Sequence, residues 1–148
     1  MEGFDSLLQP ASCRIVVPGE PVGKGRPRFV LATGRAYTPE KTARYEHLVK
    51  LEYERQHGPG LAFGRFAQIG LKLDAFFSIP QSVSRAKRAK MACGQVRPTK
   101  KPDLDNVIKT VGDALNGLAY YDDSQIVFCE VRKYYAEVPR LEIQLFEV

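Results

Sequence analysis

The sequence predicts a single compact domain of the α/β (α+β) class, in which a mixed β-sheet is packed by two or three helices. Three observations support this prediction. The chain has 148 residues, close to the usual size of one domain, with 44% hydrophobic and 26% charged residues. Stretches of alternating apolar residues are typical of strands, and stretches whose apolar residues recur every three or four positions are typical of helices. The domain is expected to cover residues 1–148, with 1–11 as a flexible N-terminal extension.

The first elements are a strand, a loop and a helix. Residues 12–18 alternate and end at a Pro-Gly turn, so we expect a short strand there. The glycine- and arginine-rich stretch 19–28 is expected to be a loop. Thr38 is a candidate N-cap and Pro39 a candidate first helical residue, which predicts a helix over 39–56.

A core strand and a basic helix follow. Residues 66–79 are rich in alternating apolar residues and end at a proline, which predicts a strand. Its core-facing side chains are predicted to be Ile69, Leu71, Leu73, Ala75 and Phe77. Residues 82–84 (Ser-Val-Ser) are able to cap a basic helix that reaches about Ala92, and 94–102 is interrupted by prolines and expected to be irregular.

The clearest helix signal covers residues 104–116. Asp103 is a candidate N-cap, and Asn116-Gly117 is the left-handed stop expected after a helix. The apolar stripe of this helix comprises Val107, Ile108, Val111, Ala114 and Leu115. Two alternating stretches, 125–135 and 140–147, predict closing strands, with 136–139 as a hairpin connection between them.

Composition excludes several classes of protein. No apolar run approaches the roughly 20 residues that cross a bilayer, and the first twelve residues lack a signal-peptide pattern, so we expect no membrane partner and a cytoplasmic location. The three cysteines, Cys13, Cys93 and Cys129, form no zinc or CxxC pattern and are expected to be reduced thiols. The loop 19–28 lacks the complete phosphate-loop motif, so no nucleotide cofactor is expected.

Basic residues are concentrated in two stretches of the chain. The net charge is +5, which permits a polyanionic partner without identifying one. The stretch 82–101 has no acidic residue, and the glycines of the loop 19–28 allow close approach to a phosphate backbone. The alternative is an ordinary solvated charged surface. The predicted nucleic-acid-binding residues are Lys24, Arg26, Arg28, Arg85, Lys87, Arg88, Lys90, Lys100 and Lys101.

Carboxylates gather where this basic stretch ends. Asp103 and Asp105 diverge by about 200° if both lie inside a helix, so they converge only if Asp103 is extended and Asp105 lies in the first turn. Two such charges 4 Å apart repel by about 4 kcal/mol at an effective dielectric of 20, which a cation offsets. Of Asp122 and Asp123, adjacent on a strand, only one is expected to reach the same place.

These oxygen ligands suit Mg²⁺, which polarises phosphate and activates water. The residues leave an alternative open. Asp103 is then only a helix cap, Asp122-Asp123 only a turn, and Asp105, Lys109 and Asp113 form exposed i,i+4 ion pairs.

The same segments carry a family resemblance. They are Lys-Pro-Asp-Leu-Asp-Asn at 101–106, Lys109, Asp-Ala-Leu-Asn-Gly at 113–117 and Asp-Asp-Ser-Gln-Ile-Val at 122–127, with a weaker match at 23–28 and 37–39. In this respect the sequence resembles the RusA family of Holliday-junction resolvases, which are small metal-dependent endonucleases. The resemblance implies a RusA-like homodimer that binds four-way branched DNA and nicks two opposing strands with Mg²⁺, for which Mn²⁺ is expected to substitute. It also implies that Asp103, Asp105 and Asp123 are the metal-binding catalytic carboxylates and that Lys109 is the essential basic residue.

A physical argument also favours the dimer. Two symmetric incisions require two active sites, the chain has one aspartate cluster, and twofold association is the commonest route to a second copy. Two other functions remain open from the sequence: a non-catalytic basic protein that recognises branched DNA by shape, and a magnesium nuclease that prefers flaps.

Overall fold

The computed structural model describes residues 11–25, 28–37 and 39–148. Within these ranges the main sheet has four strands in the order β1 (Ser12–Pro18), β6 (Arg140–Glu147), β4 (Ile69–Ser78) and β5 (Ile126–Ala136). β6 is antiparallel to β1 and β4, whereas β4 and β5 are parallel, so the sheet is mixed as predicted. The expected N-terminal extension lies, apart from Ala11, outside the described residues.

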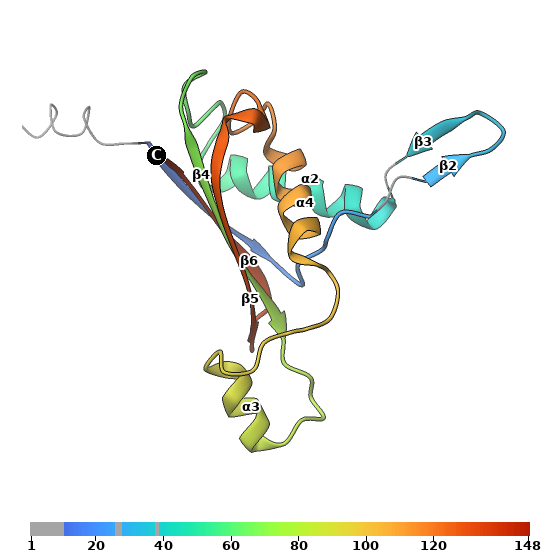
Figure 1. Ribbon diagram of the computed structural model, residues 1–148, viewed down its shortest axis with the longest axis vertical. Helices are drawn as coiled ribbons and strands as arrows, with labels where there is room; N and C mark the ends of the chain where they lie inside the picture. Colours follow the sequence, from blue (N-terminus) through green and yellow to red (C-terminus); the bar gives the residue numbers. More distant parts are fainter. Residues whose placement is uncertain (1–10, 26–27, 38) are drawn as a thin grey trace, which may run out of the picture.

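Two helices cover one face of this sheet. α2 (Glu40–Gln56) and α4 (Leu104–Leu115) lie together on that face, and α3 (Arg85–Ala92) lies at one end of the molecule (Figure 1). The predicted apolar stripe of α4 is confirmed, since four of its residues are buried and Ile108 is half-buried against the core. All five predicted core residues of β4 are buried as well. The core is therefore a single layer of side chains between the sheet and α2 with α4.

The predicted hairpin connection over 136–139 is wrong. β5 and β6 do not pair, because β4 lies between them and is hydrogen-bonded to both. The short connection after Ala136 therefore passes the end of β4 and spans two strand spacings, roughly 10 Å, which three extended residues can bridge. Alternation identified both strands correctly but carries no information about which strands pair.

A second sheet was not predicted. β2 (Arg28–Val30) and β3 (Arg35–Tyr37) form an antiparallel hairpin that extends away from the main sheet (Figure 1). Its tip closes through a hydrogen bond from the Gly34 N–H to the Val30 carbonyl at 2.8 Å, and Gly34 has a φ of 65° that favours glycine. The sequence holds a local signal for this hairpin, since the triplets Arg-Phe-Val and Arg-Ala-Tyr flank a short loop that ends in glycine.

Helix ends agree with the sequence to within a few residues. α2 begins at Glu40 with Pro39 in the N-cap position, one residue later than predicted, and Thr38 lies outside the described residues. Ser84 caps α3 through the Lys87 N–H, and Gly117 takes the left-handed φ of 74° that stops α4. The three cysteines are free thiols. Across the described ranges, no helix is long and apolar enough to cross a membrane.

Candidate active site

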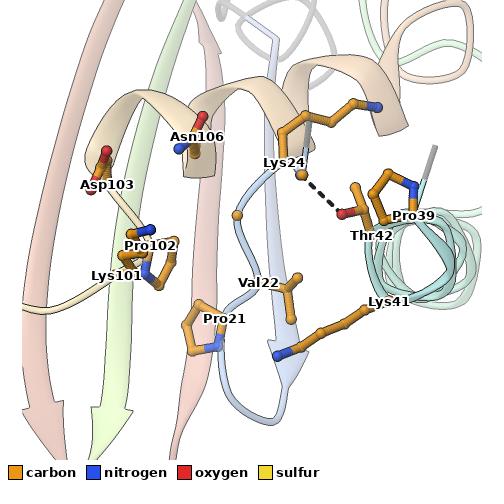
Figure 2. Close-up of a pocket in the computed structure, with 12 residues that line it drawn as sticks. Pro21, Val22, Lys24, Pro39, Lys41, Thr42, Lys101, Pro102, Asp103 and Asn106 are labelled. Carbon is orange, nitrogen blue, oxygen red and sulfur yellow. Dashed lines mark hydrogen bonds between the residues drawn. The ribbon is translucent and has the colours of Figure 1, made fainter. Parts of the chain in front are cut away.

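An open pocket of about 900 Å³ lies where two helices begin. Pro39, Lys41 and Thr42 line it from the start of α2, and Asp103 and Asn106 line it from the start of α4 (Figure 2). A helix N-terminus presents free backbone N–H groups and a partial positive charge, so each one favours an anion. Two of them on one pocket, together with exposed lysines, suit a phosphate group.

Asp103 has the conformation that convergence with Asp105 requires. It sits at the N-cap of α4 in extended conformation, with φ −70° and ψ 154°, and Asp105 follows in the first turn. An aspartate in this position normally accepts a hydrogen bond from the helix backbone. The side chain of Asp103 makes no such bond and is exposed, as is Asp105. The missing cap hydrogen bond weakens the interpretation of Asp103 as only a helix cap, and the carboxylate remains available to a ligand.

Lys109 lies one turn above Asp105 and belongs to an ion-pair cluster. Its ammonium lies 3.2 Å from Oδ1 of Asp113, while Oδ2 of Asp113 lies 3.2 Å from the ammonium of Lys24. Among the described residues, no ion pair joins Lys109 back to Asp105, so the predicted i,i+4 series is only half present. The Lys109 side chain remains 61% exposed, which leaves its ammonium able to reach a bound phosphate.

The structure gives Asp122 and Asp123 different surroundings. The carboxylate of Asp122 caps a short 3₁₀ turn by accepting a hydrogen bond from the Ser124 N–H. Hydrogen bonding to the Ser124 side chain, and then to this N–H, lowers the pKa of Asp122. Asp123 is exposed, and its backbone N–H donates to the side-chain oxygen of Asn116 at 3.1 Å. Asp122 thus stabilises the turn, whereas the Asp123 carboxylate makes no hydrogen bond or ion pair among the described residues.

The three predicted metal ligands lie at opposite ends of α4. Asp103 and Asp105 stand at its beginning, and Asp123 is held at its end through Asn116, about 18 Å further along the helix axis. Across 11–25, 28–37 and 39–148, no three His, Cys, Asp or Glu side chains are close enough together to hold a metal ion. Mg²⁺ commonly takes only one or two protein carboxylates and completes its shell with water and substrate phosphate. Asp103 and Asp105 provide such a pair.

The predicted nucleic-acid-binding residues fall into different settings. Lys24 is largely buried and paired, and Arg88 of α3 donates to Glu137 at 2.9 Å and to the Pro80 carbonyl, which fixes α3 to the β5–β6 connection. Arg26 and the side chain of Arg28 lie outside the part of the chain that the structure describes. The exposed members of the set are Lys100, Lys101, Arg85, Lys87 and Lys90.

Sequence reasoning missed Lys133 of β5. Its ammonium donates to the backbone carbonyls of Lys100 at 2.5 Å and Pro102 at 2.9 Å, and it lies over the ring of Phe77. Pro102 directly precedes Asp103, so this lysine fixes the segment that carries the first carboxylate. No local pattern could reveal the contact, because the two partners are 31 residues apart.

Replacing Lys133→Met is expected to lower the free energy of unfolding by about 1–3 kcal/mol, since the exposed carbonyl of Lys100 and the part-buried carbonyl of Pro102 lose their donor. We also expect cleavage to slow by about tenfold, because Asp103 loses its support. Urea denaturation and single-turnover cleavage of DNA measure the two effects. Lys72→Met is the matched control, as Lys72 lies exposed on β4 and pairs loosely with Glu130 at 3.9 Å. Equal cleavage rates in the two variants would contradict the assignment.

The fold and the pocket together define a small α+β protein whose polar site suits a phosphodiester backbone. The sequence matches the family described as "Endodeoxyribonuclease RusA" over residues 18–146. The chain therefore belongs to the RusA endodeoxyribonuclease family, as the motifs at 101–109 and 122–127 indicated.

Two relatives are similar to the chain. The chain is 39% identical over 139 residues to "Uncharacterized protein YqaN" of Bacillus subtilis (strain 168), an alignment that covers 91% of this chain and 96% of that protein. It is 49% identical over 51 residues to "Crossover junction endodeoxyribonuclease rusA" of Lactococcus phage r1t, which covers 34% of this chain and 39% of the phage protein.

Proposed function

We propose that the protein is a magnesium-dependent, structure-specific DNA endonuclease. It resolves Holliday junctions by paired nicks in opposing strands, during DNA recombination and repair in the cytoplasm. The observation that carries this proposal is the pocket at the start of α4. The carboxylate of Asp103, which makes no cap hydrogen bond, lines this pocket together with the start of α2 and with Lys41 and Lys101. Membership of the RusA family and the name of the phage relative support DNA as the polymer and the junction as its form.

The two carboxylates at the start of α4 fit Mg²⁺. Asp103 and Asp105 offer hard oxygen ligands that are exposed and not used by a cap or, among the described residues, by an ion pair. We assign them as the metal ligands, with Mn²⁺ as a substitute ion. Asp123 is proposed as the third catalytic carboxylate, and it must move from the far end of α4 to join them when DNA binds. When bound, the metal polarises the scissile phosphate and lowers the pKa of a water molecule.

The remaining chemistry follows from the residues of the chain. The N-termini of α2 and α4, with Lys41 and Lys101, hold the DNA backbone in the pocket. The exposed ammonium of Lys109 lies one turn above Asp105 and stabilises the charge that develops on the phosphate. Lys133 fixes the backbone before Asp103, so the carboxylate is placed before DNA arrives.

Paired nicks need two such sites. Each chain provides one pair of carboxylates at the start of α4, so we propose a homodimer whose twofold axis matches that of a four-way junction. The exposed basic residues of α3 and of 100–101 then add phosphate contacts outside the pocket.

Purified protein with an end-labelled mobile four-way junction, a flapped duplex and a linear duplex tests this function. In magnesium we expect symmetric nicks in two opposing strands of the junction, seen on denaturing gels, with at most weak cleavage of the other substrates. EDTA should abolish cleavage and leave the shifted band on a native gel. Junction binding without cleavage in magnesium or manganese would favour the architectural protein, and a preference for flaps would favour the other nuclease.

A further inference from the structure

Lys24 occupies an unusual position for a residue of a basic loop. Its ammonium donates to Oε1 of Glu46 in α2 at 2.6 Å and lies 3.2 Å from Oδ2 of Asp113 in α4, and its side chain is only 18% exposed. In Figure 2 the side chain runs alongside α4, while the side chain of Lys41 extends from α2 towards Pro21 and Val22. Lys24 thus joins the two helices that form the pocket.

The backbone around Lys24 is fixed by close packing. Its N–H donates to the Asn106 carbonyl at 2.9 Å, and the Gly25 N–H donates to the Thr42 hydroxyl at 3.0 Å. A Cβ on Gly23 would lie 2.5 Å from Cβ of Pro102, and one on Gly25 would lie 2.9 Å from the ring of Pro39. The glycines therefore allow close approach to the protein itself, which is a different use from the phosphate contact that the sequence suggested.

Two lysines, Lys24 and Lys109, balance the charge of two carboxylates, Glu46 and Asp113, in this cluster. Burial alone would lower the pKa of Lys24, but its hydrogen bonds to Glu46 and Asp113 outweigh this effect and raise it, so Lys24 stays charged. Asp113 divides its two oxygens between Lys24 and Lys109. Without Lys24, the carboxylates of Glu46 and Asp113 would both lose a largely buried cation. Among the described residues, Lys109 would then be the cation left to pair with Asp113.

We propose that Lys24 is a positioning residue for cleavage: it supplies the positive charge that Glu46 and Asp113 require, and so leaves the ammonium of Lys109 available to the DNA phosphate. This role rests on the proposed function, because it assumes that Lys109 acts on the scissile phosphate. The difference in exposure supports separate roles for the two lysines. The Lys109 side chain is 61% exposed and can reach DNA, whereas that of Lys24 is only 18% exposed.

The variant Lys24→Met tests the proposal. We expect single-turnover cleavage of the four-way junction to fall by about 10- to 100-fold, because Asp113, which already pairs with Lys109, then holds it more firmly and keeps it from the phosphate. The affinity for the junction and its dependence on salt should stay within about twofold of wild type. The matched control is Lys41→Met, an exposed lysine of the same pocket, which should weaken binding and reduce the slope of log K against log salt by about 1.

A triple variant, Lys24→Met with Glu46→Gln and Asp113→Asn, neutralises all three side chains and separates this role from a purely structural one. It removes the carboxylates that would capture Lys109, so cleavage should return to within about threefold of wild type. Thermal unfolding followed by circular dichroism confirms that each variant is folded. A folded triple variant that stays as slow as Lys24→Met would overturn the proposal, and so would a loss of affinity and salt slope in Lys24→Met equal to that of Lys41→Met.

A readout without DNA keeps this test independent of the nuclease assignment. In ¹⁵N spectra of the lysine ammonium groups, the Lys109 signal should sharpen and exchange more slowly with water in Lys24→Met, because its ion pair with Asp113 becomes permanent. An unchanged Lys109 signal would refute the coupling. If the signal changes but wild-type protein fails to cut the junction, the ion-pair coupling stands and the nuclease proposal fails.

Discussion

Asp105→Asn is expected to cut a four-way junction at less than about a thousandth of the wild-type rate, a loss of about 4 kcal/mol of transition-state stabilisation. The substitution keeps the shape of the side chain but removes a ligand charge at the start of α4. Binding should persist, because the basic residues are untouched. Single-turnover cleavage of an end-labelled junction gives the rate, and a native gel gives the affinity.

Asp74→Asn provides the matched control for this loss. Asp74 alternates with the buried Leu73 and Ala75, so it lies on the sheet face that α2 and α4 do not cover. The same chemical change there should leave the cleavage rate within about twofold of wild type. Retention of more than a tenth of the wild-type rate by Asp105→Asn would contradict its role as a metal ligand.

Lys109→Met is expected to slow cleavage by about 10²- to 10³-fold, which is typical for the loss of one group that stabilises developing charge. The junction affinity should change by less than about threefold, because one exposed lysine among many contributes little to binding. Lys109→Arg keeps the charge and should recover part of the rate. The same single-turnover assay and a titration of the junction on native gels separate the two quantities. An equal loss of rate and affinity would mean that Lys109 is only a phosphate contact.

Much of the fold could be predicted because its elements have strong local signals. The alternation in β4 placed Ile69 and Phe77 on the core face, and the stripe of α4 predicted its buried side. The pairing of β5 and β6 could not be predicted, since the insertion of β4 between them depends on contacts some 60 residues apart. The hairpin of β2 and β3 also has a local signal, the glycine at position 34, whose φ of 65° closes the turn.

In the candidate site, too, some features follow from local sequence and others depend on the tertiary fold. The extended Asp103 before α4 and the capping role of Asp122 follow from local rules for helix and turn starts. The tasks of Lys24 and Lys133 do not, because each depends on groups that only the tertiary fold brings near. A basic residue beside glycines suggested a phosphate contact, and only its burial between two helices reveals a different partner.

The position of the metal tests the central claim most directly. Crystals of the protein bound to a four-way junction, with Mn²⁺ in place of Mg²⁺, should show anomalous scattering at the manganese edge. We predict a peak bounded by the carboxylates of Asp103 and Asp105 and by a DNA phosphate. A fully occupied manganese site elsewhere on the chain, with Asp105 pointing to solvent, would contradict the assignment of the pocket as the place where DNA is cut.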